Sequence, residues 1–417
     1  MDSARIQTLS SVNNHARKLV LQFLHAITCG TLIIHDDHFG GLTIQRDDSI
    51  SATLTVHDPL FYRRLLWGGD VAAGEMWMRG QWSSPDPVQV IRLLARNQAV
   101  FDKLEARLRW LTTPLNRLRH FFTRNTLRGA RKNIAQHYDL GNDMYQLFLD
   151  PEMQYSSALF SHPEQTLADA QYNKLERICQ SLDLQAQDHL LEIGSGWGGL
   201  AIYAARHYGC HVTTVTLSQE QFTFANARIH AEGLQDRITL LLQDYRHIQG
   251  QFDKVVSIEM IEAVGETFLS GYFTQISTLL APQGRFLIQG ITIRDQRYQV
   301  YRSQTDFIRR YIFPGGFLPS LTVILDTLTR HTDLNVVQVH DFGHHYAKTL
   351  HIWRDAFNAK AAAIQQLGAS DEFMRLWDFY FAYCEAGFLE RAISVVHITG
   401  CKPGSQAWNS LDATLSR

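Results

Sequence analysis

Cysteine is scarce in this sequence, and its spacing argues against two kinds of site. The five cysteines are an odd number and lie far apart, and none of them forms a CxxC pair. A disulfide framework and a zinc knuckle both need closely spaced cysteines. We therefore expect reduced thiols, as in a cytoplasmic protein, and no metal site.

Long apolar runs and an excess of charge of one sign are also missing. The most apolar stretch, residues 19–34, is interrupted by Gln22, His25 and Thr28, so it falls short of a membrane-spanning helix. The N-terminus lacks the charged and then apolar order of a secretory signal peptide. The 417 residues carry 39 basic and 41 acidic side chains, a net charge of −2, which argues against a nucleic-acid partner. Any contact with lipid would therefore have to be made from the membrane surface.

The near-neutral total hides one basic segment. Residues 99–132 hold nine Lys and Arg against two acidic residues, a local charge of +7, and apolar residues interleave with them at helical spacing. This pattern is typical of a helix that lies on anionic lipid, and equally of a solvated helix that packs on its own protein. Both interpretations stay open for this connector.

The hydrophobic pattern divides the rest of the chain into a small N-terminal α+β domain (1–98), a long catalytic domain (133–404) and a short tail (405–417). Seven candidate strands in the long domain lie at residues 189–193, 211–216, 238–242, 254–258, 285–289, 336–340 and 394–399. Helical patterns lie between most of them, which predicts an α/β fold with a mostly parallel sheet covered by helices on both faces. Helical insertions are expected at residues 304–330, 347–366 and 370–390.

The strongest local signal is a glycine loop after the first of these strands. Gly194, Gly196 and Gly198 follow the strand directly, Glu192 precedes them, and a helical pattern follows. The spacing differs from the GxGxxG of dinucleotide-binding folds, and no acid stands at the tip of the second strand. The pattern is typical of S-adenosylmethionine methyltransferases, with an ordinary strand-to-helix turn as the alternative.

Seven segments, taken together and in order, resemble one family. They lie at residues 134–142, 153–158, 194–199, 215–218, 242–246, 259–265 and 311–315. The family is that of the cyclopropane-fatty-acyl-phospholipid synthases and the related mycolic acid cyclopropane synthases. The small N-terminal domain also looks like the lipid-binding domain of the bacterial phospholipid enzymes. The resemblance implies a class I methyltransferase fold, with a Rossmann-like seven-stranded sheet, and S-adenosylmethionine as cofactor.

The resemblance also implies the residues that hold this cofactor. Its methionine part is expected at Tyr155, Ser156, Gly194, Gly196 and Gly198. Its ribose is expected at Thr216, Leu217 and Gln221, and its adenine near Gln243. The activity implied is transfer of a methylene group to the cis double bond of an unsaturated acyl chain in a membrane phospholipid. The product would be a cyclopropane fatty acid.

The implied chemistry needs a base. An alkene that attacks the methyl group becomes a carbocation, so the site must exclude water, stabilise positive charge and finally remove a proton. The resembled family uses a bound bicarbonate for the last step, held by a cysteine, a glutamate, a histidine, a backbone group and a tyrosine. The matching positions here are Ser157, Glu262, Gln289, Ile291 and Tyr346. Because Ser157 and Gln289 depart from that set, our hypothesis is that bicarbonate binds weakly or that Glu262 takes the proton directly.

Two alternatives to a cyclopropane synthase stay open. If the proton leaves a neighbouring carbon, the enzyme is a C-methyltransferase that makes a methyl-branched chain, as some relatives are. If the departures at Ser157 and Gln289 mark a decayed site, the chain is a lipid-binding protein. By resemblance we expect a peripheral protein at the inner face of the membrane, unsaturated phospholipids as partners, no nucleic acid, and a homodimer as one state.

Overall fold

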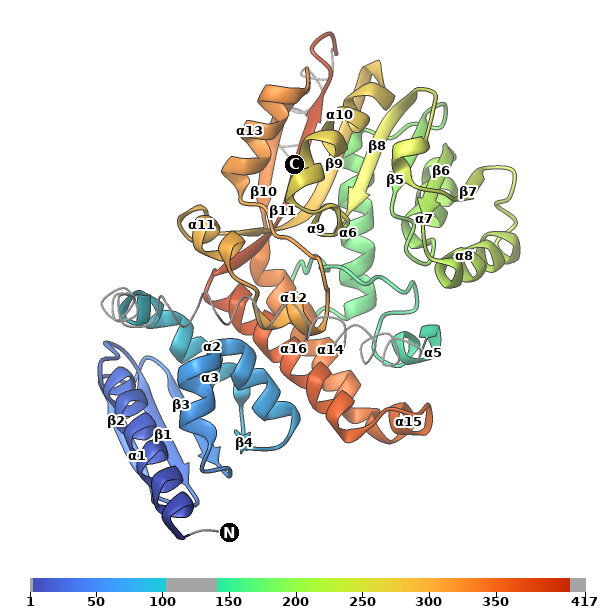
Figure 1. Cartoon of the computed structure of the whole chain (residues 1–417). Helices are drawn as coiled ribbons and strands as arrows, with labels where there is room; N and C mark the ends of the chain where they lie inside the picture. The colour runs from blue at the N-terminus through green and yellow to red at the C-terminus, as the bar shows by residue number, and fades with distance from the viewer. Residues whose placement is uncertain (1–2, 103–140, 406–417) are drawn as a thin grey trace. The chain divides into compact units, whose positions relative to one another are not determined.

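The computed structural model describes residues 3–102 and 141–405 (Figure 1). Residues 103–132 of the predicted connector and residues 406–417 of the predicted tail lie outside these ranges. The chain divides into two compact units. Unit 1 comprises residues 1–140, 304–314 and 354–392, and unit 2 comprises residues 141–303, 315–353 and 393–417. The predicted domain division therefore differs in one respect, because each of the three expected insertions contributes residues to unit 1.

Unit 1 contains a small mixed sheet and several helices. Its strands, in the order β2-β1-β3-β4, are β1 (Thr31–Asp36), β2 (Leu42–Gln45), β3 (Ser51–Val56) and β4 (Trp82–Ser83). Strand β1 pairs antiparallel with β2 and parallel with β3. Its helices are α1 (Ser3–His25), α2 (Phe61–Met78), α3 (Pro87–Arg96), α12 (Phe307–Tyr311), α15 (Ala361–Gln366) and α16 (Asp371–Leu389). Helix α16 packs against α2 and α3.

The tryptophans of unit 1 divide between its core and its surface. Trp82 is buried, its indole N–H donates to the Ala73 carbonyl at 2.8 Å, and its ring lies 4.9 Å from that of Trp77. Phe379 of α16 packs edge-on against Trp82, so these aromatic rings join the helices to the sheet. Trp67, by contrast, is 49% exposed. Trp77 and Trp82 are therefore part of the packing of this unit.

Unit 2 is built on a seven-stranded sheet, as the alternation of helix and strand predicted. Its strands are β5 (His189–Ile193), β6 (His211–Thr216), β7 (Ile238–Leu242), β8 (Phe252–Ile258), β9 (Leu280–Ile293), β10 (Asn335–Asp341) and β11 (Ile393–Cys401). The order is β10-β11-β9-β8-β5-β6-β7. The strands β9, β8, β5, β6 and β7 run parallel to one another, and β11 is antiparallel to both of its neighbours, β10 and β9. This is the mostly parallel sheet of a class I methyltransferase.

Helices cover both faces of this sheet (Figure 1). They include α6 (Leu167–Leu182), α7 (Gly199–Tyr208), α8 (Gln219–Ala231), α10 (Leu269–Leu279) and α13 (Leu321–His331). Leu190 and Leu191 are adjacent in β5 and point to opposite faces, because side chains alternate along a strand. Leu190 packs in the core that involves α6, α7 and α8, and Leu191 in the core that involves α10 and α13. Strand β5 therefore lies between two cores, and its one acidic residue, Glu192, is buried and accepts a hydrogen bond from the Thr214 hydroxyl.

Shorter elements of unit 2 gather around the strand ends, together with one long helix whose end belongs to unit 1. They are α5 (Gly141–Gln146), α9 (Ile261–Val264), α11 (Asp295–Ser303) and α14 (Gly343–Ala359). The predicted insertion at 304–330 is two helices, α12 and α13, because Pro314 and Gly315 stand between them. None of the helices that the structure describes is both long and apolar enough to cross a membrane.

Candidate active site

The glycine loop between β5 and α7 has the backbone that only glycine adopts without strain. Gly194, Gly196 and Gly198 have φ angles of 98°, 49° and 87°. The backbone N–H groups of Gly194 and Ser195 donate to the Val215 carbonyl at 3.1 and 2.8 Å, which fixes the loop to β6. A Cβ atom added to Gly196 would meet nothing within 4 Å. The loop therefore leaves open space beside its backbone, which fits a bound S-adenosylmethionine.

The ends of the next two strands lie beside this loop. The Thr216 hydroxyl at the end of β6 donates to Gln221 Oε1 at 2.9 Å and accepts from the Ser218 N–H at 3.1 Å. The Gln243 N–H, after β7, donates to the Thr216 carbonyl at 3.0 Å. Leu217 is 72% exposed between them. The structure thus brings together the residues expected at the ribose and the adenine.

A buried lysine supports the segment expected at the methionine part. Lys174 of α6 has no exposed surface, and its Nζ donates to Ser156 Oγ at 2.9 Å and to Gln154 Oε1 at 2.7 Å. Burial lowers the pKa of Lys174 to about 8, against the opposing attraction of Glu259 and other nearby carboxylates. Sequence analysis missed this residue, because in α6 it occupies an ordinary polar position.

Beyond the end of β8, the carboxylate of Glu259 receives three hydrogen bonds. Its Oε1 accepts from the Ser157 N–H at 2.9 Å and from Gln289 Nε2 at 2.7 Å, and its Oε2 accepts from the Tyr346 hydroxyl at 2.7 Å. Burial raises the pKa of Glu259, and these three donors act in the opposite direction. Three of the five predicted catalytic residues therefore meet at a glutamate that was not among them.

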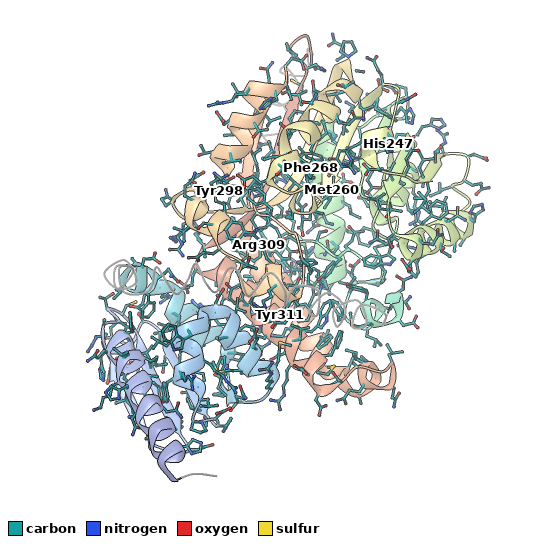
Figure 2. The ribbon with its side chains drawn as sticks, in the orientation of Figure 1. His247, Met260, Phe268, Tyr298, Arg309 and Tyr311 are labelled. Atoms are coloured by element: carbon teal, nitrogen blue, oxygen red, sulfur yellow. The ribbon has the colours of Figure 1, made fainter. Side chains whose placement is uncertain are left out.

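Glu262, three residues later, is bound differently. Its Oε1 accepts from the Ile291 N–H at 2.5 Å, so two groups expected to hold bicarbonate bind each other. No donor from the described ranges reaches its buried Oε2. Burial and the neighbouring charge of Glu259 raise the pKa of Glu262 to about 8. Met260, labelled in Figure 2, stands between the two glutamates in the sequence and lies over the glycine loop, with its Cγ 3.4 Å from a Cβ added to Gly194.

A histidine on the adjacent strand orients Gln289. Residues His397 of β11 and Gln289 of β9 are directly paired, and His397 Nε2 lies 2.8 Å from Gln289 Oε1. Burial holds the pKa of His397 well below its usual range, so the ring is neutral and its Nε2–H donates to the amide oxygen. The amide nitrogen of Gln289 is then directed at Glu259. His397 is a second residue that sequence analysis missed.

Aromatic rings surround Tyr155. Tyr155 stacks on Trp353 with ring centroids 5.3 Å apart, and Tyr145 meets Tyr155 edge-on at 5.2 Å. Trp197, from the glycine loop, lies 5.1 Å from Tyr145, and Tyr346 meets Trp353 edge-on. Aromatic faces stabilise positive charge, which a carbocation site requires. The expectation that the glycine loop, the carboxylates and aromatic rings converge is therefore consistent with the geometry, although the individual roles remain predictions.

Replacing Gly196 with valine is expected to abolish cofactor binding, because the side chain would enter the open space beside the loop and would be strained at a φ of 49°. A bound ligand at a hundredfold excess over its Kd stabilises a fold by about 2.7 kcal/mol. Thermal unfolding with S-adenosylhomocysteine should show this gain for the wild type and none for Gly196→Val.

Gly233→Val is the matched control, since Gly233 also has a positive φ of 65° and open space around its Cβ position but lies in the turn after α8. It should keep the gain. Cofactor stabilisation of Gly196→Val equal to that of Gly233→Val would remove the loop from the binding site.

Comparison with known proteins gives consistent results. Residues 125–398 match the sequence profile of a family described as mycolic acid cyclopropane synthetase. The chain is 39% identical over 366 residues to a tuberculostearic acid methyltransferase of Mycobacterium tuberculosis, which covers 86% of this chain and 85% of that protein. It is 37% identical over 361 residues to the cyclopropane-fatty-acyl-phospholipid synthase of Escherichia coli, covering 83% and 87%. Both relatives therefore align along most of their length.

One solved structure is similar in fold and contains a bound ligand. A mycolic acid cyclopropane synthase complexed with S-adenosylhomocysteine matches with a TM-score of 0.60 and 29% identity, over 65% of this chain and 98% of that one. The residues matched by the family profile, 125–398, include the glycine loop and strands β5 to β10.

Proposed function

Because the chain belongs to the cyclopropane synthase family of S-adenosylmethionine-dependent methyltransferases that act on lipid acyl chains, we propose that it transfers one carbon to the cis double bond of an unsaturated acyl chain in a membrane phospholipid. The product of this proposal is a cyclopropane fatty acid. The observation that carries it is the position of two glutamates, Glu259 and Glu262, between a cofactor loop and aromatic rings.

The residues around these glutamates suit carbocation chemistry. When bound, S-adenosylmethionine supplies an electrophilic methyl group, whose transfer leaves positive charge on the acyl chain. The loop at Gly194 to Gly198, together with Thr216 and Gln243, would hold the cofactor. The rings of Tyr346 and Trp353 are buried, so they can stabilise positive charge while they keep water from the cation. A carboxylate nearby then accepts the proton.

A methyl-branched product is the second candidate. It is favoured by the 39% identity with a tuberculostearic acid methyltransferase, which exceeds the identity with the cyclopropane-fatty-acyl-phospholipid synthase. The decayed lipid-binding protein is the weakest alternative, because a site without activity would not need three positive-φ glycines and two buried carboxyls. With phospholipid as substrate, the protein would act peripherally at the inner face of the membrane.

The products can be separated with S-adenosylmethionine that carries a fully deuterated methyl group. We expect label in the fatty acids of unsaturated phospholipid vesicles, with two of the three deuterons retained and a ring that survives mild hydrogenation. Retention of all three deuterons, in a chain that hydrogenation converts to a methyl-branched one, would favour the second candidate. Absence of label from lipid would contradict both enzymatic functions.

A further inference from the structure

The strongest unassigned feature of the molecule is the carboxylate of Glu259. Ser157, Gln289 and Tyr346, which hold it, come from three separate parts of the chain, 102, 30 and 87 residues away from Glu259. All three residues are buried. The Ser157 backbone N–H and the Gln289 amide donate to Oε1, and the Tyr346 hydroxyl donates to Oε2. A site assembled from such distant segments specifies the position of one anion closely.

These donors leave no place for a bicarbonate ion beside Glu259. The positions that the resembled family uses to hold bicarbonate include those of Ser157, Gln289 and Tyr346, and here all three donate to the Glu259 side chain. A carboxylate and bicarbonate present the same pair of acceptor oxygens, so one can replace the other on the same donors. The residues present therefore do not fit bound bicarbonate.

The backbone of Glu259 supports a function for its side chain. Its φ angle is 48°, a left-handed conformation that costs a non-glycine residue about 1 kcal/mol. The Glu259 N–H donates to the Gln289 carbonyl at 2.8 Å, which holds the chain in this conformation just beyond β8. Glycine would adopt it without strain, so a glutamate here gains nothing from the backbone and is explained by what its carboxylate does.

The two glutamates also differ in how readily their carboxyl groups hold a proton. Glu259 accepts three hydrogen bonds, which favour its ionised form, whereas Glu262 accepts one from the backbone and has a pKa of about 8. Two adjacent buried carboxyls do not both ionise readily. At neutral pH Glu262 therefore keeps the proton, whereas the three donors on Glu259 and the charge of Lys174 favour the anion there.

From this geometry we propose that the Glu259 carboxylate is the built-in base of the reaction, in the place that the resembled family gives to bicarbonate, and that turnover needs no bicarbonate. The inference rests on the proposed function. In the step assigned to Glu259, a C–H bond of the transferred methyl group breaks and the proton goes to the carboxylate. The electron pair of that bond forms the second bond to the cationic carbon and closes the ring. Gln289 and His397 are positioning residues for this base.

Two substitutions of Glu259 test the proposal. Glu259→Gln keeps the size of the side chain and removes the base, so turnover should fall by about 10²- to 10⁴-fold whether or not bicarbonate is present. Glu259→Gly suits the positive φ and leaves the three donors facing an empty volume. Turnover of this variant should fall as far in carbon-dioxide-depleted buffer and recover in part when bicarbonate is added. The wild type should be indifferent to bicarbonate.

Two further measurements separate the base from the fold and from the proposed function. Glu266→Gln, in the same segment but exposed and paired with Arg302, should keep wild-type turnover. Isotopically labelled bicarbonate, followed by its NMR signal, should bind Glu259→Gly and not the wild type, which is a readout independent of activity. S-adenosylhomocysteine should stabilise every variant.

Wild-type turnover that rises several-fold with bicarbonate would overturn the proposal, as would a Glu259→Gln enzyme within about threefold of the wild type. A Glu259→Gly variant that neither binds nor responds to bicarbonate would show that the carboxylate does not occupy the bicarbonate position. If the wild type labels no lipid at all, the proposed function fails, and the binding comparison still decides the position of Glu259.

Discussion

Glu262→Gln should be more stable than the wild type at pH 8 and should keep turnover near the wild-type level. The carboxyl has a pKa of about 8 in the folded chain, against an ordinary value of 4.5. Between these values the folded state holds a proton that the unfolded state has lost, so the wild type loses stability as pH rises through this window. Glutamine is neutral in both states, so the stability of the variant does not fall across this pH window.

The size of this gain follows from the width of the window. A shift from 4.5 to about 8 corresponds to at most about 5 kcal/mol, at 1.36 kcal/mol per pH unit. Although Oε2 of Glu262 is buried, the residue as a whole is only half-buried, so water reduces the penalty and we expect a gain of about 2 kcal/mol at pH 8. At pH 4.5 wild type and variant should be equally stable. Chemical denaturation across this pH range measures the difference.

Turnover of Glu262→Gln at neutral pH should stay near that of the wild type, because the carboxyl it replaces is protonated there and glutamine is also neutral. Stabilisation by S-adenosylhomocysteine should be retained. A loss of about 10²-fold would instead indicate that Glu262 is the base and would contradict its protonation at neutral pH. Glu176→Gln is a control of opposite sign, because hydrogen bonds from Tyr203 and Tyr208 contribute to lowering the pKa of Glu176 despite its partial burial. Its replacement should reduce stability at neutral pH. A Glu262→Gln variant that is less stable than the wild type at pH 8 would contradict the assigned protonation state.

The sequence was sufficient for the parts of the fold that depend on local pattern. Strand β5 and the glycine loop were predictable because a short, mostly apolar strand pattern ends in glycines, which adopt positive φ without strain. The insertion at 304–330 was only partly predictable. Its helical periodicity continues on both sides of Pro314, but the proline and the glycine after it separate α12 from α13.

The carboxylate cluster could not be predicted in the same way. The sequence places Glu259 and Glu262 in one short segment after the buried strand β8, but only Glu262 was among the expected catalytic residues. It does not show that Ser157, Gln289 and Tyr346 would meet at the first of them and not the second. That choice depends on the φ angle of Glu259 and on the pairing of β9 with β11, which are properties of the folded chain.

Lys174→Met should have the second large effect, because it removes a positive charge from a region where carboxylates are buried. Methionine preserves the bulk of the side chain but leaves Ser156 Oγ without its donor and Glu259 without a nearby cation. Breaking a buried charge interaction costs about 3–5 kcal/mol. We expect a loss of about 3 kcal/mol in the free energy of unfolding at neutral pH.

The same change should alter the pH dependence of turnover, which a purely structural lysine would not do. Without Lys174 the pKa of Glu259 rises further, since a nearby positive charge favours the ionised form. The acidic limb of the pH–rate profile, where the base becomes protonated, should therefore move to higher pH. Lys254→Met is the matched control: Lys254 is also buried, but it lies within β8 and pairs with Asp188 at 3.7 Å. It should lose stability without moving the limb. If the acidic limb of the pH–rate profile does not move in Lys174→Met, Lys174 has only a packing role. A shift in that variant alone would show that Lys174 of α6 affects the charge on Glu259.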